Sequence, residues 1–267
     1  MLVLYHATAS VASAKTRLVL REKDLCWQSE VLDLQRGDQH RPEYLTLNPT
    51  AVVPTLVHDG RVITESTVVM EYLDETFPTP PLMSSEAYSR ALARLWMKKI
   101  DDCLHGACAT LTFAIAFRRF LLKRTPAELE ARFRAIQDAT VREARRLAVM
   151  HGIAAPHVPP ALQYLDKYLG EMEEELSRAP YLGGDVYSLV DAAVTPYVYR
   201  AEMLGLDQLW VDRRPQVAAW FERVRARPSF ERAITGVLTD LDKERLSVAR
   251  DESWPAVREI LLNDASG

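Results

Sequence analysis

The sequence is poor in cysteine, and its few cysteines form no recognisable pattern. Cys26, Cys103 and Cys108 are an odd number in 267 residues and lack the paired spacing of a metal-binding motif. This excludes a disulfide-stapled scaffold and a zinc module as the basis of the fold, and we expect no metal site. Free thiols fit a reducing compartment, so we expect a cytoplasmic protein.

The sequence also lacks a charge excess and a long apolar run. Its 33 basic and 37 acidic residues give a net charge of −4, whereas nucleic-acid-binding proteins usually carry a clear basic excess. No uninterrupted apolar stretch approaches the ~20 residues of a membrane helix. The short apolar run at the start has no preceding basic residue, which a signal peptide would have. We therefore expect neither nucleic acid nor a membrane among the partners.

What is present is a globular composition, with 48% hydrophobic and 26% charged residues, and a mixed pattern over residues 1–82. The pattern predicts strands at Leu2–His6 and Trp27–Leu34, and a hairpin around Asp59–Gly60. A helix is predicted from Ser66 to Phe77, and a proline-rich stretch ends this first domain.

From Ser84 onward the pattern is helical, and no strand is predicted. The expected helices are Tyr88–Phe120, Pro126–Met150, Pro160–Ser177, Ser188–Met203 and Pro215–Ala226. The sequence therefore predicts an α+β domain followed by an all-α domain at residues 88–267.

Two serines stand where the first strand passes into the first helix. Ser10 and Ser13 form an S-x-x-S pattern at a helix N-terminus, where unpaired N–H groups and a positive partial charge stabilise an anion such as a thiolate. A thioredoxin-type redox protein would hold C-x-x-C here. This chain cannot form that disulfide, but it can hold a thiolate from another molecule. The alternative is that one serine only caps the helix.

Two further segments suit an extended ligand that carries both charges. Pro54 precedes a predicted strand, and a cis peptide bond there would turn the backbone of Val53 outward, toward a peptide-like ligand. A trans proline at a strand start is the alternative. Ser66 begins a helix whose N-terminus can receive a carboxylate, and Glu65 suits an ammonium group. Simple capping by Ser66 is the alternative there.

In this order and spacing, these segments resemble the glutathione transferase superfamily over nearly the whole chain. The motifs that carry the resemblance are NPTAVVPTLVHDGRVITESTVVMEYLDETFP and YSLVDAAVTP. The resemblance implies a thioredoxin-like, glutathione-binding domain with a mixed four-stranded sheet at 1–82, and an all-helical domain with the electrophile pocket at 88–267. It also implies a homodimer with glutathione as co-substrate. Ser188 and Asp191 match the capping box of the family, which marks them as folding residues.

The resemblance also implies which residues contact glutathione. Val53, ahead of a cis proline, binds the cysteinyl part through its backbone, while Glu65 and Ser66 hold the γ-glutamyl end. His40 matches a position that reaches the glycyl carboxylate in some classes; a solvated loop histidine is the alternative. Val52 departs from the family, where Lys or Gln often stands, and this removes a side-chain contact to glutathione.

The activating hydroxyl has two candidates. Alignment with the serine-type classes places Ser10 at the catalytic position, whereas a gap-free alignment with ether-cleaving enzymes favours Ser13; Tyr5 is expected to pack in the core. Bringing a thiol from a pKa near 8.5 to about 7 or below needs about 1.36 kcal/mol per unit. A hydrogen bond to a charged acceptor, about 1.5–3 kcal/mol, and a helix N-terminus, about 0.3–1 kcal/mol, can supply this.

The electrophile pocket is expected at the start of the helical domain. Its candidate residues are His105, Cys108, Thr112, Phe113 and Phe117, with helix–helix packing as the alternative for each; Cys103 and Cys108 are expected to be buried. From Arg118 to Arg146 there are nine basic and four acidic residues. This stretch is either a solvated helical face or a rim that attracts an anionic aromatic substrate.

Within the superfamily, HDGRVITESTVVMEYLDETFP and RLWMKKIDD are most similar to bacterial transferases that cleave β-aryl ethers. We therefore expect a transferase that activates the glutathione thiolate for attack on a hydrophobic electrophile, aromatic or aryl-ether in kind. The alternative is a non-catalytic relative that serves as a binding or scaffold protein.

Overall fold

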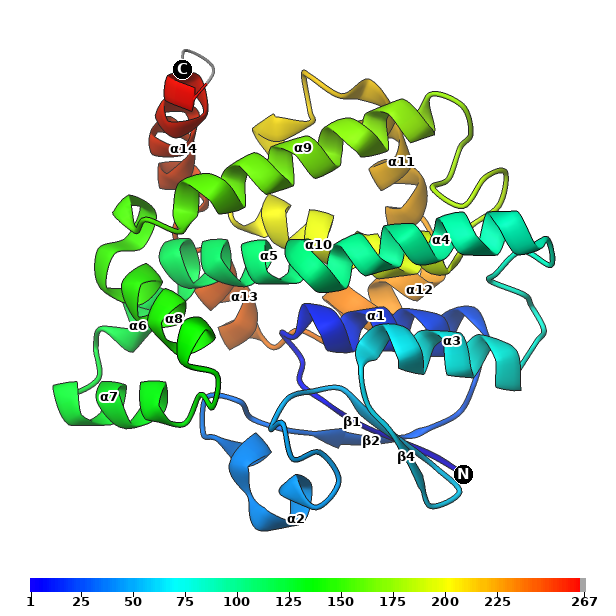
Figure 1. Cartoon of the computed structure of the whole chain (residues 1–267), viewed down its shortest axis with the longest axis horizontal. Helices are drawn as coiled ribbons and strands as arrows, with labels where there is room; N and C mark the ends of the chain where they lie inside the picture. The colour runs from blue at the N-terminus through cyan, green and yellow to red at the C-terminus, as the bar shows by residue number, and fades with distance from the viewer. Residues whose placement is uncertain (265–267) are drawn as a thin grey trace. The chain divides into compact units, whose positions relative to one another are not determined.

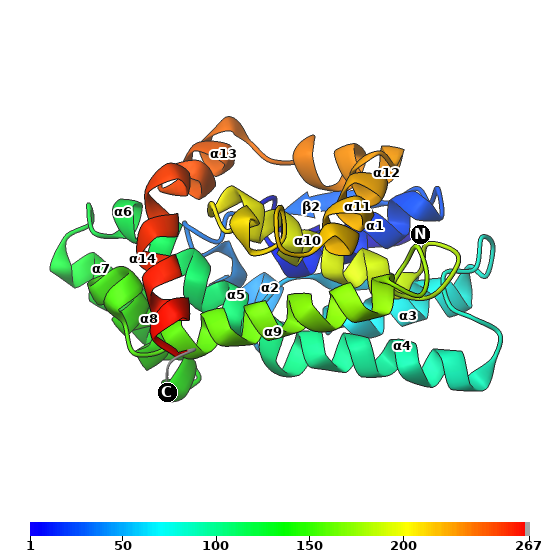
Figure 2. The ribbon, with the colours of Figure 1, turned by 90° about the horizontal axis from the view of Figure 1, so that it is seen from above.

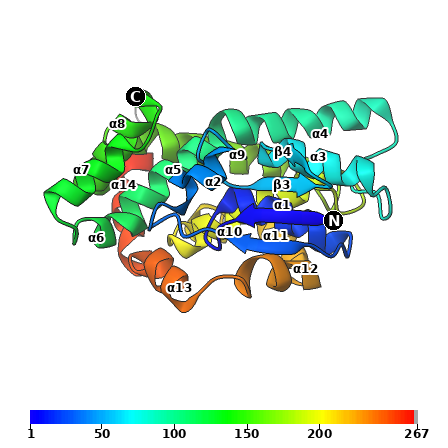
Figure 3. The ribbon, with the colours of Figure 1, turned by 90° about the horizontal axis from the view of Figure 1, so that it is seen from below.

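A four-stranded mixed sheet forms from short apolar runs separated by turn residues. In the computed structural model, which describes residues 1–264, the strands are β1 (Leu2–His6), β2 (Gln28–Val31), β3 (Thr55–His58) and β4 (Arg61–Ile63). Their order is β2-β1-β3-β4, with β1 and β2 parallel and the other pairs antiparallel (Figure 3). The hairpin at Asp59–Gly60 is confirmed, and both turn residues have positive φ, 48° and 78°, as a two-residue turn requires. β2 is shorter than predicted, because this edge strand pairs only with β1.

Helices make up most of the remaining described chain. They are α1 (Val11–Glu22), α2 (Pro42–Leu45), α3 (Ser66–Thr76), α4 (Ala87–Lys99), α5 (His105–Thr112), α6 (Arg118–Leu121), α7 (Pro126–Arg134), α8 (Ala139–His151), α9 (Val158–Leu176), α10 (Leu189–Met203), α11 (Pro215–Arg225), α12 (Pro228–Phe230), α13 (Asp240–Ser247) and α14 (Arg250–Asp264). No strand follows Ile63 within residues 64–264. The predicted fold class, an α+β domain and then an all-α region, is confirmed.

The chain divides into two units. The sheet unit comprises Met1–Lys98, Arg178–Pro196 and Trp220–Thr239. The helical unit comprises Lys99–Ser177, Tyr197–Ala219 and the described residues from Asp240 on. Two segments distant in sequence from the strands therefore pack with the sheet. The domain boundary expected near residues 82–88 stays a prediction.

Helix α1 is enclosed within the sheet unit. Every residue from Ala12 to Leu20 is buried, so the helix has no solvent face. It packs against α3 and against residues 228–235, where Arg17 Nε donates to the Ala233 carbonyl at 2.8 Å. Figure 1 shows α1 and α3 side by side along one face of the sheet, with α2 on the opposite side (Figures 1 and 3). This packing holds the N-terminus of α1 in a fixed place.

Residues 87–121 form one helical run, which passes through π-helical turns at Ile100–Leu104 and Phe113–Phe117. An 18-residue window of this run has a mean hydropathy of 1.2, so the run is long and apolar enough to cross a membrane although charged residues interrupt it. Half of that window is buried inside the protein. Within the helical unit, α5 lies along α9 (Figures 1 and 2). Packing in a protein core accounts for the apolar character of the run.

The single helix predicted over Pro126–Met150 is wrong, because α7 and α8 are separate. The break falls at residues 135–138, where Asp138 caps α8 by accepting the Val141 N–H at 2.9 Å. Helical periodicity continues across this cap, which is why the two helices were predicted as one; α13 and α14 near the end of the chain were not predicted.

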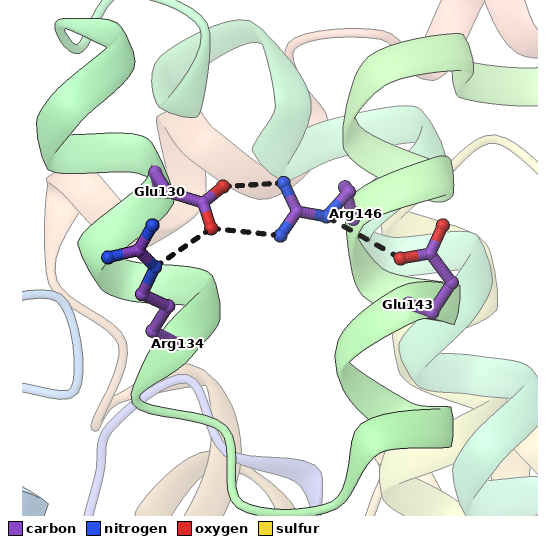
Figure 4. A network of polar contacts seen from close by, with 4 residues as sticks. All are labelled: Glu130, Arg134, Glu143 and Arg146. Atoms are coloured by element: carbon purple, nitrogen blue, oxygen red, sulfur yellow. Dashed lines mark hydrogen bonds and ion pairs between the residues drawn. The ribbon is translucent and has the colours of Figure 1, made fainter.

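An ion-pair network joins α7 to α8 (Figure 4). Glu130 on α7 pairs with Arg146 on α8 at 2.5 Å, and Arg134 adds a second contact to Glu130 at 3.1 Å. Glu143 lies 3.5 Å from Arg146. Hydrogen bonding to Arg146 lowers the pKa of Glu130 to about 2, so this carboxylate is ionised throughout the neutral range.

A buried carboxylate organises the start of α10. Asp191 accepts the Leu182 N–H at 2.9 Å and the Trp220 indole N–H at 2.8 Å, and its other oxygen accepts the Ser188 N–H at 2.9 Å and hydroxyl at 2.8 Å. One bond of the predicted capping box is thus present, the one from the Ser188 N–H to the Asp191 carboxylate, while the Ser188 hydroxyl donates to the same carboxylate. Gly183 is required nearby, since a Cβ there would stand 2.2 Å from Ser188 Oγ. Burial raises the pKa of Asp191, and the four donors oppose that shift.

Candidate functional site

Ser10 closes the loop after β1 and begins α1. It is the N-cap residue, with φ −78° and ψ 122°, and its Oγ accepts the Ser13 N–H at 3.1 Å. That bond uses only the oxygen, so the hydroxyl proton remains available to a further acceptor. The side chain is partly exposed. Ser10 can therefore cap the helix and donate to an anion at the same time, so the two interpretations of the S-x-x-S pattern are compatible at this residue.

Ser13 differs from Ser10 in its surroundings. It is 0% exposed, and its Oγ accepts the Ala7 N–H at 3.3 Å. The Ser13 hydroxyl therefore ties the first turn of α1 to the preceding loop from the inside of the fold.

Arg17 holds the same loop from within. It is buried, and its guanidinium donates to the carbonyls of Ala7 and Thr8 at 3.0 and 3.1 Å. It also lies 3.1 Å from His6 Nδ1. Burial, and secondly the charge of Arg17, lower the pKa of His6 to about 4, so the imidazole is neutral at pH 7. With Nδ1 accepting from Arg17, His6 Nε2 donates to Ser29 Oγ at 2.7 Å.

A second buried cation lies where α1 meets α3. Lys15 is 0% exposed, and its Nζ donates to Thr67 Oγ1 at 3.0 Å, which joins the first turns of the two helices. The positive ends of both helix dipoles and an ammonium group therefore gather near Ser10 and Ser66. This raises the positive potential where the sequence predicts that a thiolate and a carboxylate bind.

The loop before β3 is fixed by a buried polar network. Asn48 Nδ2 donates to the Val52 carbonyl at 3.0 Å and to Thr55 Oγ1 at 3.1 Å. The Tyr44 hydroxyl bonds to the same two groups, donating to the Val52 carbonyl and lying 2.9 Å from Thr55 Oγ1. The side chain of Val52, the residue that departs from the family, is 50% exposed.

Val53 stands at the end of this network. The Val53–Pro54 peptide bond is cis, as the sequence predicts. Val53 packs with Ala7 and Tyr44 in one cluster, so it lies against the loop that leads to Ser10. Its backbone N–H and C=O have no hydrogen-bond partner among the described residues. Two backbone groups are thus left for a peptide-like ligand.

Glu65 has an unusual backbone at the start of α3. Its φ is +65°, it occupies the N-cap position without a side-chain cap, and it is exposed. A positive φ is uncommon outside glycine and costs about 1–3 kcal/mol, and such residues cluster at functional sites. Ser66 is the first residue of the helix and is not its N-cap. The alternative that Ser66 merely caps α3 is therefore wrong.

Two contacts bring Ser10, Val53 and Glu65–Ser66 into one region of the sheet unit. Lys15 bonds to Thr67, and Ala7 packs against Val53. No hydrogen bond or ion pair joins His40 to this set among the described residues. It is exposed in a short 3₁₀ turn, and its Nε2 lies 3.3 Å from the side-chain amide nitrogen of Gln39.

The pocket candidates lie in the helical unit and fall into two groups. His105, Cys108 and Thr112 follow one face of α5; His105 is exposed and bonds to the Tyr197 hydroxyl at 3.1 Å, whereas Cys108 and Thr112 are buried in the core. Phe113 and Phe117 are partly buried, with ring centroids 5.1 Å apart. Cys103 was expected to be buried but is exposed.

Sequence reasoning missed four supporting residues: Lys15, Arg17, Tyr44 and Asn48. Lys15 and Arg17 follow the S-x-x-S pattern, but nothing in the sequence shows that their side chains point inward. No motif in the sequence marks Tyr44 or Asn48 as the polar residues that fix the loop before β3.

Comparison with known proteins agrees with this geometry. Residues 4–81 match the glutathione S-transferase N-terminal domain, and residues 127–223 match the glutathione S-transferase C-terminal domain. Protein LigF of Sphingobium sp. strain SYK-6 is 27% identical over 235 residues, which are 86% of this chain and 91% of LigF. The crystal structure of beta-etherase LigF from that strain matches with a TM-score of 0.79, covering 87% of this chain and 98% of its own.

A second relative supports the same family. The tetrachloro-p-hydroquinone reductive dehalogenase of Sphingobium chlorophenolicum is 31% identical over 245 residues, which are 86% of this chain and 94% of that enzyme. The chain belongs to the glutathione transferase family. It is a glutathione transferase, and glutathione is its co-substrate.

Proposed function

We propose that this transferase cleaves an aryl ether of a hydrophobic aromatic substrate, using a glutathione thiolate held at the start of α1. The thiol gives its proton to solvent, and the sulfur attacks the carbon that carries the aryloxy group. A C–S bond forms, the C–O bond breaks, and the phenolate leaves and takes a proton from water. Similarity to LigF, whose structure is described as a beta-etherase, supports this substrate class.

The observation that carries the proposal is the partly exposed Ser10 hydroxyl at the N-terminus of α1. Its free proton can be donated to the thiolate, and the buried Lys15 adds positive charge nearby. A charge-assisted hydrogen bond of about 1.5–3 kcal/mol lowers a thiol pKa by about 1–2 units. Ser13 is the less suitable group, because it is fully buried.

A substrate panel tests the proposal. The full-length protein is incubated with glutathione and either β-aryl ethers or aryl halides, and the released phenol and the thioether are quantified. We expect the β-aryl ethers to be cleaved, with one molecule of phenol released for each molecule of thioether formed. Turnover of aryl halides alone would contradict ether cleavage. Glutathione binding without turnover of any electrophile would favour the non-catalytic alternative.

For the co-substrate we propose that the Val53 backbone binds the cysteinyl part of glutathione, and that Glu65 and Ser66 hold the γ-glutamyl end. The unpartnered backbone of Val53 and the exposed, positive-φ Glu65 at the N-terminus of α3 support these roles. His40 is proposed for the glycyl carboxylate on the resemblance alone.

Glu65→Gln should remove the preference for the γ-glutamyl ammonium group. In the wild type, glutathione should bind roughly ten- to a hundredfold more tightly than its analogue without that amino group, because a charge-assisted bond is lost. In Glu65→Gln the two affinities should converge. Calorimetry on both ligands measures this, with Glu75→Gln at the opposite end of α3 as a control that keeps the preference. Equal binding of both ligands by the wild type would remove Glu65 from its role.

We also propose a homodimer that uses the exposed face of α4. Tyr88, Leu92 and Leu95 recur at helical spacing on this face and are 70%, 43% and 56% exposed. Such a row of apolar residues is costly in water and typical of an interaction surface.

We further propose a cytoplasmic location. Cys26 and Cys103 are exposed and form no disulfide, which supports a location in the reducing cytoplasm.

The double variant Leu92→Glu, Leu95→Glu should be a monomer, because four buried carboxylates across a two-fold interface would repel one another. Light scattering at micromolar concentration should give twice 30.3 kDa for the wild type and 30.3 kDa for the variant. Leu122→Glu, on a residue 42% exposed in the helical unit, should keep the wild-type mass. A wild-type mass of 30.3 kDa would contradict the dimer.

A further inference from the structure

A guanidinium group in the helical unit lies over one ring of an aromatic pair. Arg145 on α8 places its Cζ 3.7 Å from the ring centroid of Phe113. Phe113 meets Phe117 edge to face, with an interplanar angle of 88°. Both rings also pack against the cluster that α7 and α8 form with α6. A cation and two partly buried aromatic side chains are thus held together.

Arg145 has no acidic partner among the described residues, unlike its neighbour on α8. Arg146 pairs with Glu130 and Glu143 (Figure 4). Arg118, on α6, donates to the carbonyls of Val149 and Met150. The positive charge of Arg145 is opposed only by the face of Phe113, which attracts a cation but does not neutralise it.

The surroundings of Arg145 disfavour an isolated charge. Burial, and secondly the charge of Arg132, lower the pKa of Arg145 to about 10, so the group is still cationic at neutral pH. Arg145 is partly buried, and a partly buried charge with a like charge nearby is stabilised when an anion binds. No hydrogen bond involves the Arg145 guanidinium among the described residues, so its N–H donors are available to a carboxylate in bidentate geometry.

We propose that Arg145, Phe113 and Phe117 form a subsite, within the helical unit, for a carboxylate attached to an aromatic ring. The carboxylate pairs with Arg145, and the attached ring packs against the two phenylalanines. The carboxylate pairs with the guanidinium whether or not the protein cleaves ethers, because all three residues belong to the helical unit.

Binding of a matched pair of probes tests the subsite without any reaction. We choose 2-naphthoate and 2-naphthamide, which share one ring system and differ in charge, and titrate both into the full-length protein by calorimetry. The wild type should bind naphthoate roughly ten- to a hundredfold more tightly than naphthamide. Arg145→Met should bring this ratio to about one, while Arg145→Lys should keep part of it because the charge remains.

Arg134→Gln is the control, because it removes one positive charge from a side chain that is 75% exposed. It should leave the naphthoate preference unchanged. A wild-type ratio near one, an unchanged ratio in Arg145→Met, or an equal loss in Arg134→Gln would each overturn the subsite. Circular dichroism confirms that each variant is folded, and the Lys variant keeps the test open if Arg145→Met is not.

Discussion

Replacing Ser10 by alanine should raise the pKa of bound glutathione by about 1–2 units, because one charge-assisted hydrogen bond to the thiolate is lost. Near neutral pH the thiolate fraction, and with it turnover, should fall roughly ten- to a hundredfold. Glutathione affinity should change little, since the contacts proposed for Val53, Glu65 and Ser66 remain. The pH profile of kcat/KM shows the shift directly, because the rise in activity moves to higher pH.

Ser13→Ala is the matched control, because it removes a hydroxyl three residues away on the same helix. Its Oγ accepts the Ala7 N–H inside the fold. We expect the profile to stay near that of the wild type, with a loss of about 1 kcal/mol in the free energy of unfolding. The opposite ranking of the two variants would make Ser13 the activating group. If neither variant shifts the profile, backbone N–H groups at the start of α1 hold the thiolate.

Asp191→Ala should lower the free energy of unfolding by at least about 4 kcal/mol. Four donors lose their acceptor inside the core. They are the N–H groups of Leu182 and Ser188, the Ser188 hydroxyl and the Trp220 indole N–H. Each buried group without a partner costs about 1–3 kcal/mol, although the costs do not simply add. The melting temperature should fall by roughly 8–16 °C, since about 1 kcal/mol shifts it by 2–4 °C in a chain of this size.

Asp185→Ala provides the comparison, because Asp185 is exposed in the same segment. It should change the free energy of unfolding by less than about 0.5 kcal/mol. Urea denaturation followed by circular dichroism measures both variants. A loss below about 1.5 kcal/mol in Asp191→Ala would show that water or rearranged side chains satisfy the four donors.

Features of the fold that depend on a few neighbouring residues, such as turns, could be predicted from the sequence. Asp59–Gly60 gave the hairpin because its turn geometry favours those residues, and the cis bond before Pro54 followed from the family motif. The paired helices α7 and α8 could not be separated, because periodicity continues across residues 135–138. The decisive feature there is Asp138 as a cap, which resembles any other acidic residue on a helix face.

The residues proposed to contact glutathione could be predicted from the sequence, but the buried residues that hold them in place could not. The S-x-x-S pattern and the family motifs predicted Ser10, Val53 and Glu65 as site residues, because all three stand at the ends of helices or strands, where groups are exposed to a ligand. The sequence gives no sign that Lys15 and Arg17 point inward, whereas both are buried and paired with groups from other elements. For the same reason Arg145 could not be told apart from Arg146 in sequence, although only Arg146 has carboxylate partners among the described residues.

Titration of the thiolate absorbance of glutathione bound to the wild-type chain tests most directly whether this fold activates the thiol. The positive N-terminus of α1, the Ser10 hydroxyl and the buried Lys15 all favour the charged sulfur. The bound thiol should titrate with a pKa near or below 7, compared with about 8.5 for a free thiol. With binding established by calorimetry on the same sample, a bound pKa that stays at about 8.5 would contradict thiolate activation by this chain.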